Sequence, residues 1–103
     1  MCSTGNYVET GINGVHGDMT EYFADSPEYL VKIPGSLANV GVLMEPMSVA
    51  EKAIRQSFDV QNRLYWLPKK ALVYGAGPIG LLTAMALRER HIETYVAAWS
   101  KPG

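Results

Sequence analysis

Three glycines, Gly75, Gly77 and Gly80, form the pattern G-x-G-x-x-G, whose spacing indicates a specific chemistry. The first glycine of such a pattern permits a tight turn, the second lets the backbone approach a pyrophosphate, and the third lets a helix pack closely on a strand. Free N–H groups at the start of the next helix can then bind the anion. The sequence therefore predicts a dinucleotide-binding turn, with contacts from Gly75, Gly77, Pro78, Ile79 and Gly80.

The residues around the turn support this interpretation. An apolar run over 71–74 is typical of a buried strand, an apolar helical pattern continues from Pro78 to Leu87, and a second strand is predicted over 94–98. Strand, turn, helix and strand fit within the roughly 30 residues of a βαβ unit. One alternative is a helix and strand whose glycines serve packing only. The other alternative is a membrane-spanning helix over 71–87. Three glycines and a proline in its middle disfavour it, as does a length at the lower limit for crossing a bilayer.

The segment before this unit has weaker patterns. Residues 1–18 are expected to be loop, and 19–24 and 29–33 are expected to be short β runs separated by a turn. A short helical stretch is predicted over 37–44, with a break after Glu45 because Pro46 follows it. Ser48 and Glu51 have the spacing of a capping box, which predicts a second helix over 49–64.

Composition restricts the class of protein. With 103 residues, 48% hydrophobic residues and a net charge of −1, the chain is typical of one soluble globular domain, and nothing indicates nucleic acid or a membrane as partner. One cysteine cannot form an internal disulfide, and no signal peptide is recognisable, so a cytoplasmic location is expected. A doubly wound nucleotide fold needs about six strands. We therefore expect the chain to be part of a longer protein.

Taken together, the motifs resemble the zinc-dependent medium-chain dehydrogenase/reductase family, in particular its microbial glucose dehydrogenase branch. The resemblance extends over essentially the whole chain, and its order and spacing are more specific than any one motif. The segments that carry it are Cys2–Gly5, Glu9–Ile12, Gly17–Tyr22, Leu30–Pro34, Glu45–Ser48, Glu51–Ala53 and Gly75–Gly80.

The resemblance implies an α/β fold in two parts. Residues 1–64 would be the C-terminal part of a GroES-like, β-rich catalytic domain, and residues 65–103 would begin a Rossmann NAD(P)-binding domain with its first βαβ unit. Homo-oligomers are expected of the full-length protein, because the family commonly forms dimers and tetramers.

Three residues acquire roles from the resemblance. Cys2 matches the last of four cysteines that hold a structural zinc, and Glu45 matches a glutamate that coordinates or approaches the catalytic zinc close to the substrate. Glu9 matches a glutamate that hydrogen-bonds sugar hydroxyls. From the residues alone, the alternative for Cys2 is a free thiol near a terminus, and the alternative for Glu9 and Glu45 is a carboxylate in water. Val49 stands where some glucose dehydrogenases carry an acidic sugar contact, which leaves glucose itself open.

The end of the second strand bears on the choice of cofactor. An NAD site has an acidic residue there to bind the ribose 2′-hydroxyl, whereas residues 98–101 read Ala-Trp-Ser-Lys. Ser100 and Lys101 can donate to a 2′-phosphate, so NADP, or both NADP and NAD, is favoured over NAD alone. Trp99 is positioned either to stack on adenine or to cover apolar core.

The activity implied for the parent protein is zinc-assisted oxidation of the C1 hydroxyl of a glucose-like aldose to a lactone, with hydride passing to NADP or NAD. Another medium-chain polyol, threonine or alcohol dehydrogenase is the alternative enzyme. A non-catalytic, truncated nucleotide-binding remnant is the alternative from another class. We expect the 103-residue chain alone to be inactive, because the other metal ligands would lie upstream of Met1.

Overall fold

The computed structural model describes residues 4–99. The chain forms two compact units, and the boundary between them along the sequence falls between Lys32 and Ile33. In the first unit, β1 (Glu9–Thr10) pairs in parallel with β2 (Gly14–Val15). The backbone N–H of Glu9 donates to the Asn13 carbonyl at 2.7 Å, which closes a tight turn. This short pairing lies within the segment expected to be loop.

The two β runs expected at 19–24 and 29–33 are absent from the structure. Within residues 4–32, β2 is followed by one regular element, a 3-10 turn at Pro27–Tyr29. Pro27 favours this turn, because its fixed φ suits a first helical position and its missing N–H is not needed there. Met19 and Tyr22 are almost fully exposed, and a strand without a partner would leave its backbone groups unpaired.

The second unit begins with 3-10 turns at Gly35–Leu37 and Gly41–Leu43, where the sequence predicts one short helix. Helix α1 (Met44–Gln61) follows, so the predicted break after Glu45 is wrong. Pro46 lies in the first turn, where the backbone N–H has no partner within the helix and its loss costs nothing.

Ser48 lies inside α1, so its predicted capping role is also wrong. Its hydroxyl donates instead to the Glu45 carbonyl at 2.6 Å. At the other end, α1 stops at Gln61, three residues before the predicted end. The Gln61 side-chain amide there donates to the Trp66 carbonyl at 2.5 Å, which holds the chain as it leaves the helix.

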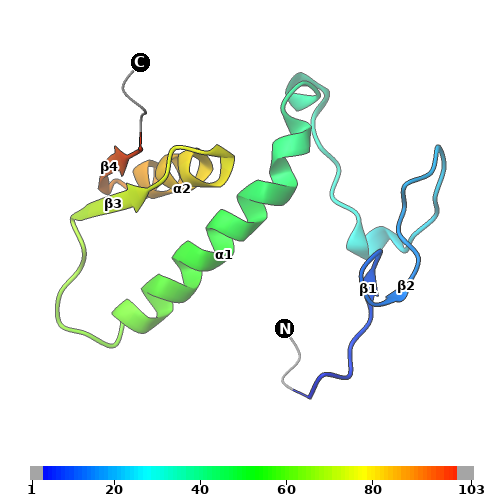
Figure 1. The fold of residues 1–103 in the computed structure, drawn as a ribbon, viewed down its shortest axis with the longest axis horizontal. Helices are drawn as coiled ribbons and strands as arrows, with labels where there is room; N and C mark the ends of the chain where they lie inside the picture. The colour runs from blue at the N-terminus through cyan, green and yellow to red at the C-terminus, as the bar shows by residue number, and fades with distance from the viewer. Residues whose placement is uncertain (1–3, 100–103) are drawn as a thin grey trace. The chain divides into compact units, whose positions relative to one another are not determined.

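The predicted strand, turn, helix and strand are confirmed. β3 (Lys70–Tyr74), α2 (Pro78–Glu89) and β4 (Glu93–Ala97) form a βαβ unit with parallel strands, in a register that runs from Lys70 opposite Glu93 to Tyr74 opposite Ala97 (Figure 1). Parallel pairing brings the carboxyl ends of both strands to one edge of the sheet, where the glycine turn begins.

Small side chains bring the two helices together. Ala50 and Ile54 of α1 are buried, as are Leu82, Ala84 and Ala86 of α2 and Ile92 before β4. Alanines let helix backbones approach closely, and their burial removes apolar surface from water. The resulting core lies within the unit that begins at Ile33.

This core includes α1 as well as the βαβ unit. The expected boundary between a GroES-like part at 1–64 and a Rossmann part at 65–103 therefore falls inside one compact unit of this chain, and it stays a prediction about the parent protein. Neither α1 nor α2, nor any other helix within residues 4–99, has the length and apolar composition needed to cross a membrane.

Candidate nucleotide-binding site

The first glycine of the turn has the backbone conformation that the sequence predicts. Gly75 has a φ of +103°, a region that side chains with a Cβ rarely adopt. Its N–H donates to the Ala97 carbonyl at 2.7 Å, so the turn starts directly from the β3–β4 ladder. Gly75 therefore reverses the chain at the carboxyl edge of the sheet.

Gly80 and Gly77 differ in what surrounds them. A Cβ at Gly80 would lie 2.0 Å from the Gly75 carbonyl oxygen, so only glycine lets α2 approach the turn this closely. A Cβ at Gly77 would have no heavy atom within 4 Å. The third glycine thus serves packing, whereas the second faces open space in which a phosphate could approach the backbone.

Helix α2 begins at this open side. Gly77 is the N-cap residue with an extended backbone, and Pro78 occupies the first helical position. The Leu81 N–H donates to the Gly77 carbonyl at 2.9 Å, the first bond of the helix. Because Gly77 has no side-chain oxygen, it cannot cap the N–H groups of Ile79 and Gly80, and the helix dipole adds partial positive charge there. These groups can bind an anion.

A pocket of about 410 Å³ adjoins the turn, lined by Tyr74, Gly75, Ala97, Ala98 and Trp99. Its lining comes from the carboxyl ends of both strands, the edge at which open α/β sheets bind ligands. Trp99, singled out from the sequence, is present here and 92% exposed. Tyr74 is not among the residues predicted for the site, although an aromatic residue directly before the first glycine of the turn is a usable signal.

Glu45, in the same compact unit as this pocket, is not among its lining residues. Ser100, Lys101 and Cys2 lie outside the described residues. Glu45 is exposed in the first turn of α1, and Glu9 is exposed in β1, which belongs to the other compact unit. Their roles toward metal and sugar stay predictions.

The described residues do not fit a zinc site by themselves. Among residues 4–99, no three His, Cys, Asp or Glu side chains come together in a group that could hold a metal ion. A tetrahedral zinc site needs four ligands, or three and a water. Glu45 could supply one oxygen ligand at most.

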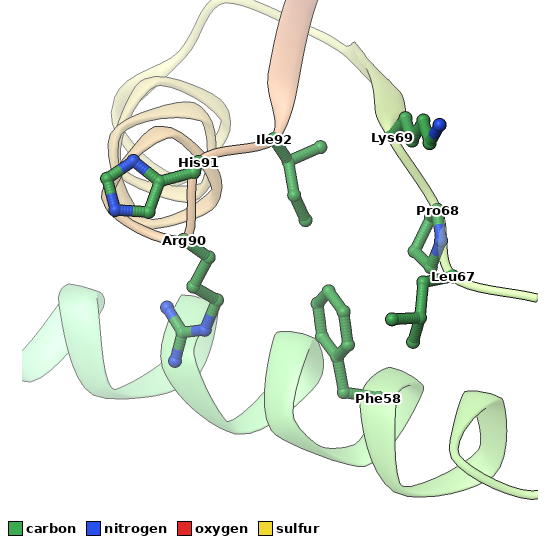
Figure 2. A pocket seen from close by; sticks show the side chains of 7 residues that line it. All are labelled: Phe58, Leu67, Pro68, Lys69, Arg90, His91 and Ile92. Carbon is green, nitrogen blue, oxygen red and sulfur yellow. The ribbon is translucent and has the colours of Figure 1, made fainter.

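A second pocket, of about 570 Å³, lies at the opposite ends of the strands, where Lys69 and Ile92 precede β3 and β4. Figure 2 shows the Phe58 ring pointing from α1 toward Ile92, whereas the His91 ring turns away from the pocket. Its position at the amino ends of the strands separates it from the Gly75–Gly80 turn at their carboxyl ends.

Arg90, beside this second pocket, is engaged with α1. Its guanidinium donates to both carboxylate oxygens of Glu51, at 3.0 and 2.5 Å, and to the Ala86 carbonyl at 3.0 Å. The hydrogen bond from Arg90 lowers the pKa of Glu51 and outweighs desolvation, which raises it; the charge of Arg90 lowers it further by a smaller amount. The same hydrogen bond raises the pKa of Arg90. This pair links α2 to α1.

The structure is a small α/β fold in which the glycine turn joins β3 to α2 at the carboxyl edge of two parallel strands. Residues 38–102 match the family described as "Glucose dehydrogenase C-terminus", and the chain belongs to this family.

Curated relatives agree with this assignment. Residues of this chain are 52% identical over 93 residues to a glucose 1-dehydrogenase of Methanocella arvoryzae, an alignment covering 90% of the chain and 26% of the relative. They are 45% identical over 103 residues to glucose 1-dehydrogenase 2 of Vulcanisaeta moutnovskia, covering 99% and 30%. With glucose 1-dehydrogenase 1 of Caldivirga maquilingensis the identity is 47% over 102 residues, covering 98% and 29%. The chain thus spans between about a quarter and a third of these relatives.

Proposed function

We propose that this chain is the cofactor-binding segment of a sugar 1-dehydrogenase that oxidises a glucose-like aldose with NADP or NAD. The observation that carries the proposal is the Gly75–Gly80 turn at the carboxyl edge of two parallel strands, with Gly80 packed against Gly75 and the Gly77 side open. Membership of the glucose dehydrogenase family and the names of the relatives support the choice of substrate.

In the proposed reaction, hydride leaves C1 of the cyclic sugar for the nicotinamide ring, and the C1 hydroxyl loses its proton. The C1–O bond becomes the carbonyl of a lactone, so the sugar is oxidised by two electrons and the cofactor reduced by two. The contribution of this chain is to hold the cofactor pyrophosphate on the N–H groups at the start of α2 and thereby to position the nicotinamide.

The remaining roles follow the family resemblance. Ser100 and Lys101 would donate to a 2′-phosphate, and Glu9 would accept hydrogen bonds from the sugar. Glu45 would supply a carboxylate to a catalytic zinc, and Cys2 would be one of four ligands of a structural zinc. Both zinc ions need ligands beyond the described residues. We also infer that the parent protein combines a GroES-like and a Rossmann domain, is cytoplasmic, and forms homo-oligomers.

A segment exchange tests the proposal. This chain would replace the aligned segment of the Methanocella arvoryzae glucose 1-dehydrogenase, to which it is 52% identical. We expect the chimera to reduce NADP or NAD with glucose or another aldose, and to be less active with threonine, simple alcohols and polyols. A chimera that shows the circular dichroism of the parent enzyme, yet binds neither nucleotide, would contradict the proposal. Preference for a non-sugar substrate would favour the alternative dehydrogenases.

A further inference from the structure

Asn13 and Gly14 form the one Asn-Gly pair in the sequence. The other three asparagines are each followed by a residue with a larger side chain: Tyr7 after Asn6, Val40 after Asn39 and Arg63 after Asn62. All four asparagines are exposed to solvent. The four sites therefore differ mainly in the residue that follows the amide, and only at Gly14 does the following backbone nitrogen have no Cβ beside it.

The backbone of the turn favours glycine at this position. Gly14 has a φ of +79°, a region that glycine adopts without strain and that residues with a Cβ rarely adopt. A Cβ there would lie 3.2 Å from Cγ1 of Val8. The turn thus places after Asn13 the residue type that least hinders the approach of an amide carbon to the next backbone nitrogen.

One hydrogen bond at the surface holds the Asn13 side chain. Its amide nitrogen Nδ2 donates to the Tyr7 carbonyl at 2.8 Å, and both residues are exposed. The buried apolar side chains of the described residues all belong to the other compact unit, which begins at Ile33. Segments with few buried contacts open locally at a low cost in free energy. The Asn13 amide can therefore leave the Tyr7 carbonyl without disturbing the core.

We propose that Asn13 is a site of spontaneous modification, at which the side-chain amide becomes a carboxylate through a cyclic imide. Asparagine is among the chemically labile residues. The Gly14 backbone nitrogen attacks Cγ of Asn13, the new N–Cγ bond forms as the Cγ–Nδ2 bond breaks, and ammonia leaves with the proton of the Gly14 N–H. Solvent water then adds to one of the two imide carbonyls, and no electrons are exchanged with any other molecule.

Two products follow from the two imide carbonyls. If water breaks the bond from the Gly14 nitrogen to Cγ, residue 13 becomes aspartate. If water breaks the bond to the backbone carbonyl carbon, residue 13 becomes isoaspartate, and the main chain continues to Gly14 through the former side chain. Both products carry a negative charge that the asparagine lacks.

Either product alters the turn that holds Glu9. The Glu9 N–H donates to the Asn13 carbonyl at 2.7 Å, and the Asn13 N–H donates to the Glu9 carbonyl at 2.8 Å. A carboxylate at residue 13 has no N–H to donate to the Tyr7 carbonyl and places negative charge beside that oxygen. Isoaspartate also lengthens the main chain by one methylene before Gly14, which disturbs the pairing of Glu9 with Gly14. The consequence for sugar binding by Glu9 rests on the proposed function.

The test incubates the folded 103-residue chain at mildly alkaline pH and follows each asparagine by peptide mass spectrometry, with labelling by an isoaspartate methyltransferase as a second readout. We expect Asn13 to gain the mass of an amide-to-acid exchange about tenfold faster than Asn39 or Asn62, which corresponds to about 1.4 kcal/mol of activation free energy. Asn13→Gln is the matched variant, because it keeps an exposed amide but needs a larger ring, and it should stay unmodified. Equal rates at Asn13, Asn39 and Asn62, or no conversion at Asn13, would overturn the proposal.

The consequence for Glu9 is measured in the Methanocella chimera. During incubation, kcat/KM for the aldose should fall in proportion to the fraction of Asn13 converted, while the affinity for NADP or NAD stays unchanged. The Asn13→Gln chimera, incubated in parallel, should keep its initial kcat/KM. Constant kcat/KM during conversion of Asn13 would overturn the link to Glu9. A chimera that is inactive before incubation would contradict the proposed function alone, because the conversion is measured by mass and not by activity.

Discussion

Arg90 and Glu51 are 39 positions apart in the sequence and form the two-pronged ion pair that joins α2 to α1. Arg90 also donates to the Ala86 carbonyl in the last turn of its own helix, where a cation interacts favourably with the helix dipole. One side chain therefore satisfies the end of α2 and links it to α1. The link lies in the same compact unit as the glycine turn, which is at the other end of α2.

Removing this ion pair should lower stability in a pH-dependent way. We expect Glu51→Gln and Arg90→Gln each to lower the urea midpoint at pH 7, measured by circular dichroism. Because the folded-state pKa of Glu51 is lowered from its ordinary value of 4.5, its contribution is present above that pH and is lost as the pH falls through the folded-state pKa. The difference between the unmodified chain and Glu51→Gln should therefore shrink toward pH 3.

Arg88→Gln is the matched control for this experiment. Arg88 lies in the last turn of the same helix and is exposed, so its loss removes a similar charge without breaking the pair. The effect of Arg90→Gln should also decrease in high salt, which screens exposed charges. An equal midpoint shift for Arg88→Gln, or a Glu51→Gln effect that is constant with pH, would mean that net charge and not the pair is responsible.

Substitutions at two glycines of the turn should distinguish an effect on folding from an effect on nucleotide binding. Gly80→Ala places a Cβ 2.0 Å from the Gly75 carbonyl oxygen, which forces the helix and turn apart. Overpacking typically costs about 1–3 kcal/mol, which outweighs the roughly 1 kcal/mol that alanine gains from helix propensity. We therefore expect a lower free energy of unfolding and loss of ADP binding in isothermal titration calorimetry.

Gly77→Ala is the companion variant, because a Cβ there meets no heavy atom within 4 Å and the φ is −76°. Its free energy of unfolding should stay within about 0.5 kcal/mol of the unmodified chain. Its ADP affinity should fall, since the methyl group occupies the space needed by the pyrophosphate. Unchanged ADP affinity in folded Gly77→Ala would show that the phosphate binds elsewhere.

The βαβ unit could be predicted because its signals are local. Gly75 needs a positive φ, α2 has a helical apolar pattern, and both strands are short apolar runs beside turns. The start of α1 was mispredicted because Pro46 was interpreted as a break, although a proline in a first helical turn loses no hydrogen bond. The β runs predicted at 19–24 and 29–33 are absent, because a β-like composition does not by itself supply a partner strand.

The candidate site could be predicted only in part, because some of its contacts are local in the sequence and others join distant segments. Gly75 and Gly80 are five residues apart, so their contact follows from one turn of backbone. Tyr74 and Ala97 meet through the register of two strands, which no local pattern specifies. The contact of Arg90 with Glu51 likewise depends on the packing of two helices, so neither relationship could be derived from spacing.

Glu45 should matter for turnover more than for folding. In the Methanocella chimera, we expect Glu45→Ala to lower kcat about a hundredfold, the scale of about 3 kcal/mol for one preorganised electrostatic contact at a reacting centre. Its exposed position in the first turn of α1 predicts a small stability change. Asp59→Ala, an exposed acid on the same helix, should change neither. If Glu45→Ala lowers the melting temperature but leaves kcat unaltered, Glu45 has a structural role.

We expect cofactor preference to depend on the end of β4, where Ala98 and Trp99 line the pocket and, among residues 4–99, no acidic side chain does. The acid within this strand, Glu93, is at its first residue, where its carboxylate accepts a hydrogen bond from Tyr95 and lies 3.4 Å from the Lys70 ammonium group. Glu93 is therefore at the wrong end to bind a ribose 2′-hydroxyl, and nothing in this lining would repel a 2′-phosphate.

We accordingly expect the chimera to use NADP at least as well as NAD, and Ala98→Asp with Lys101→Ala to shift kcat/KM toward NAD. The new carboxylate would bind the free 2′-hydroxyl and repel the 2′-phosphate. An ion pair in contact with solvent typically contributes at most about 1 kcal/mol, so we expect Ala98→Asp alone to produce most of the shift and Lys101→Ala alone the smaller part. Measuring kcat/KM with both cofactors for the two single variants and the double variant separates these contributions. Strict use of NAD by the unmodified chimera would mean that the residues after Ala98 do not face the ribose.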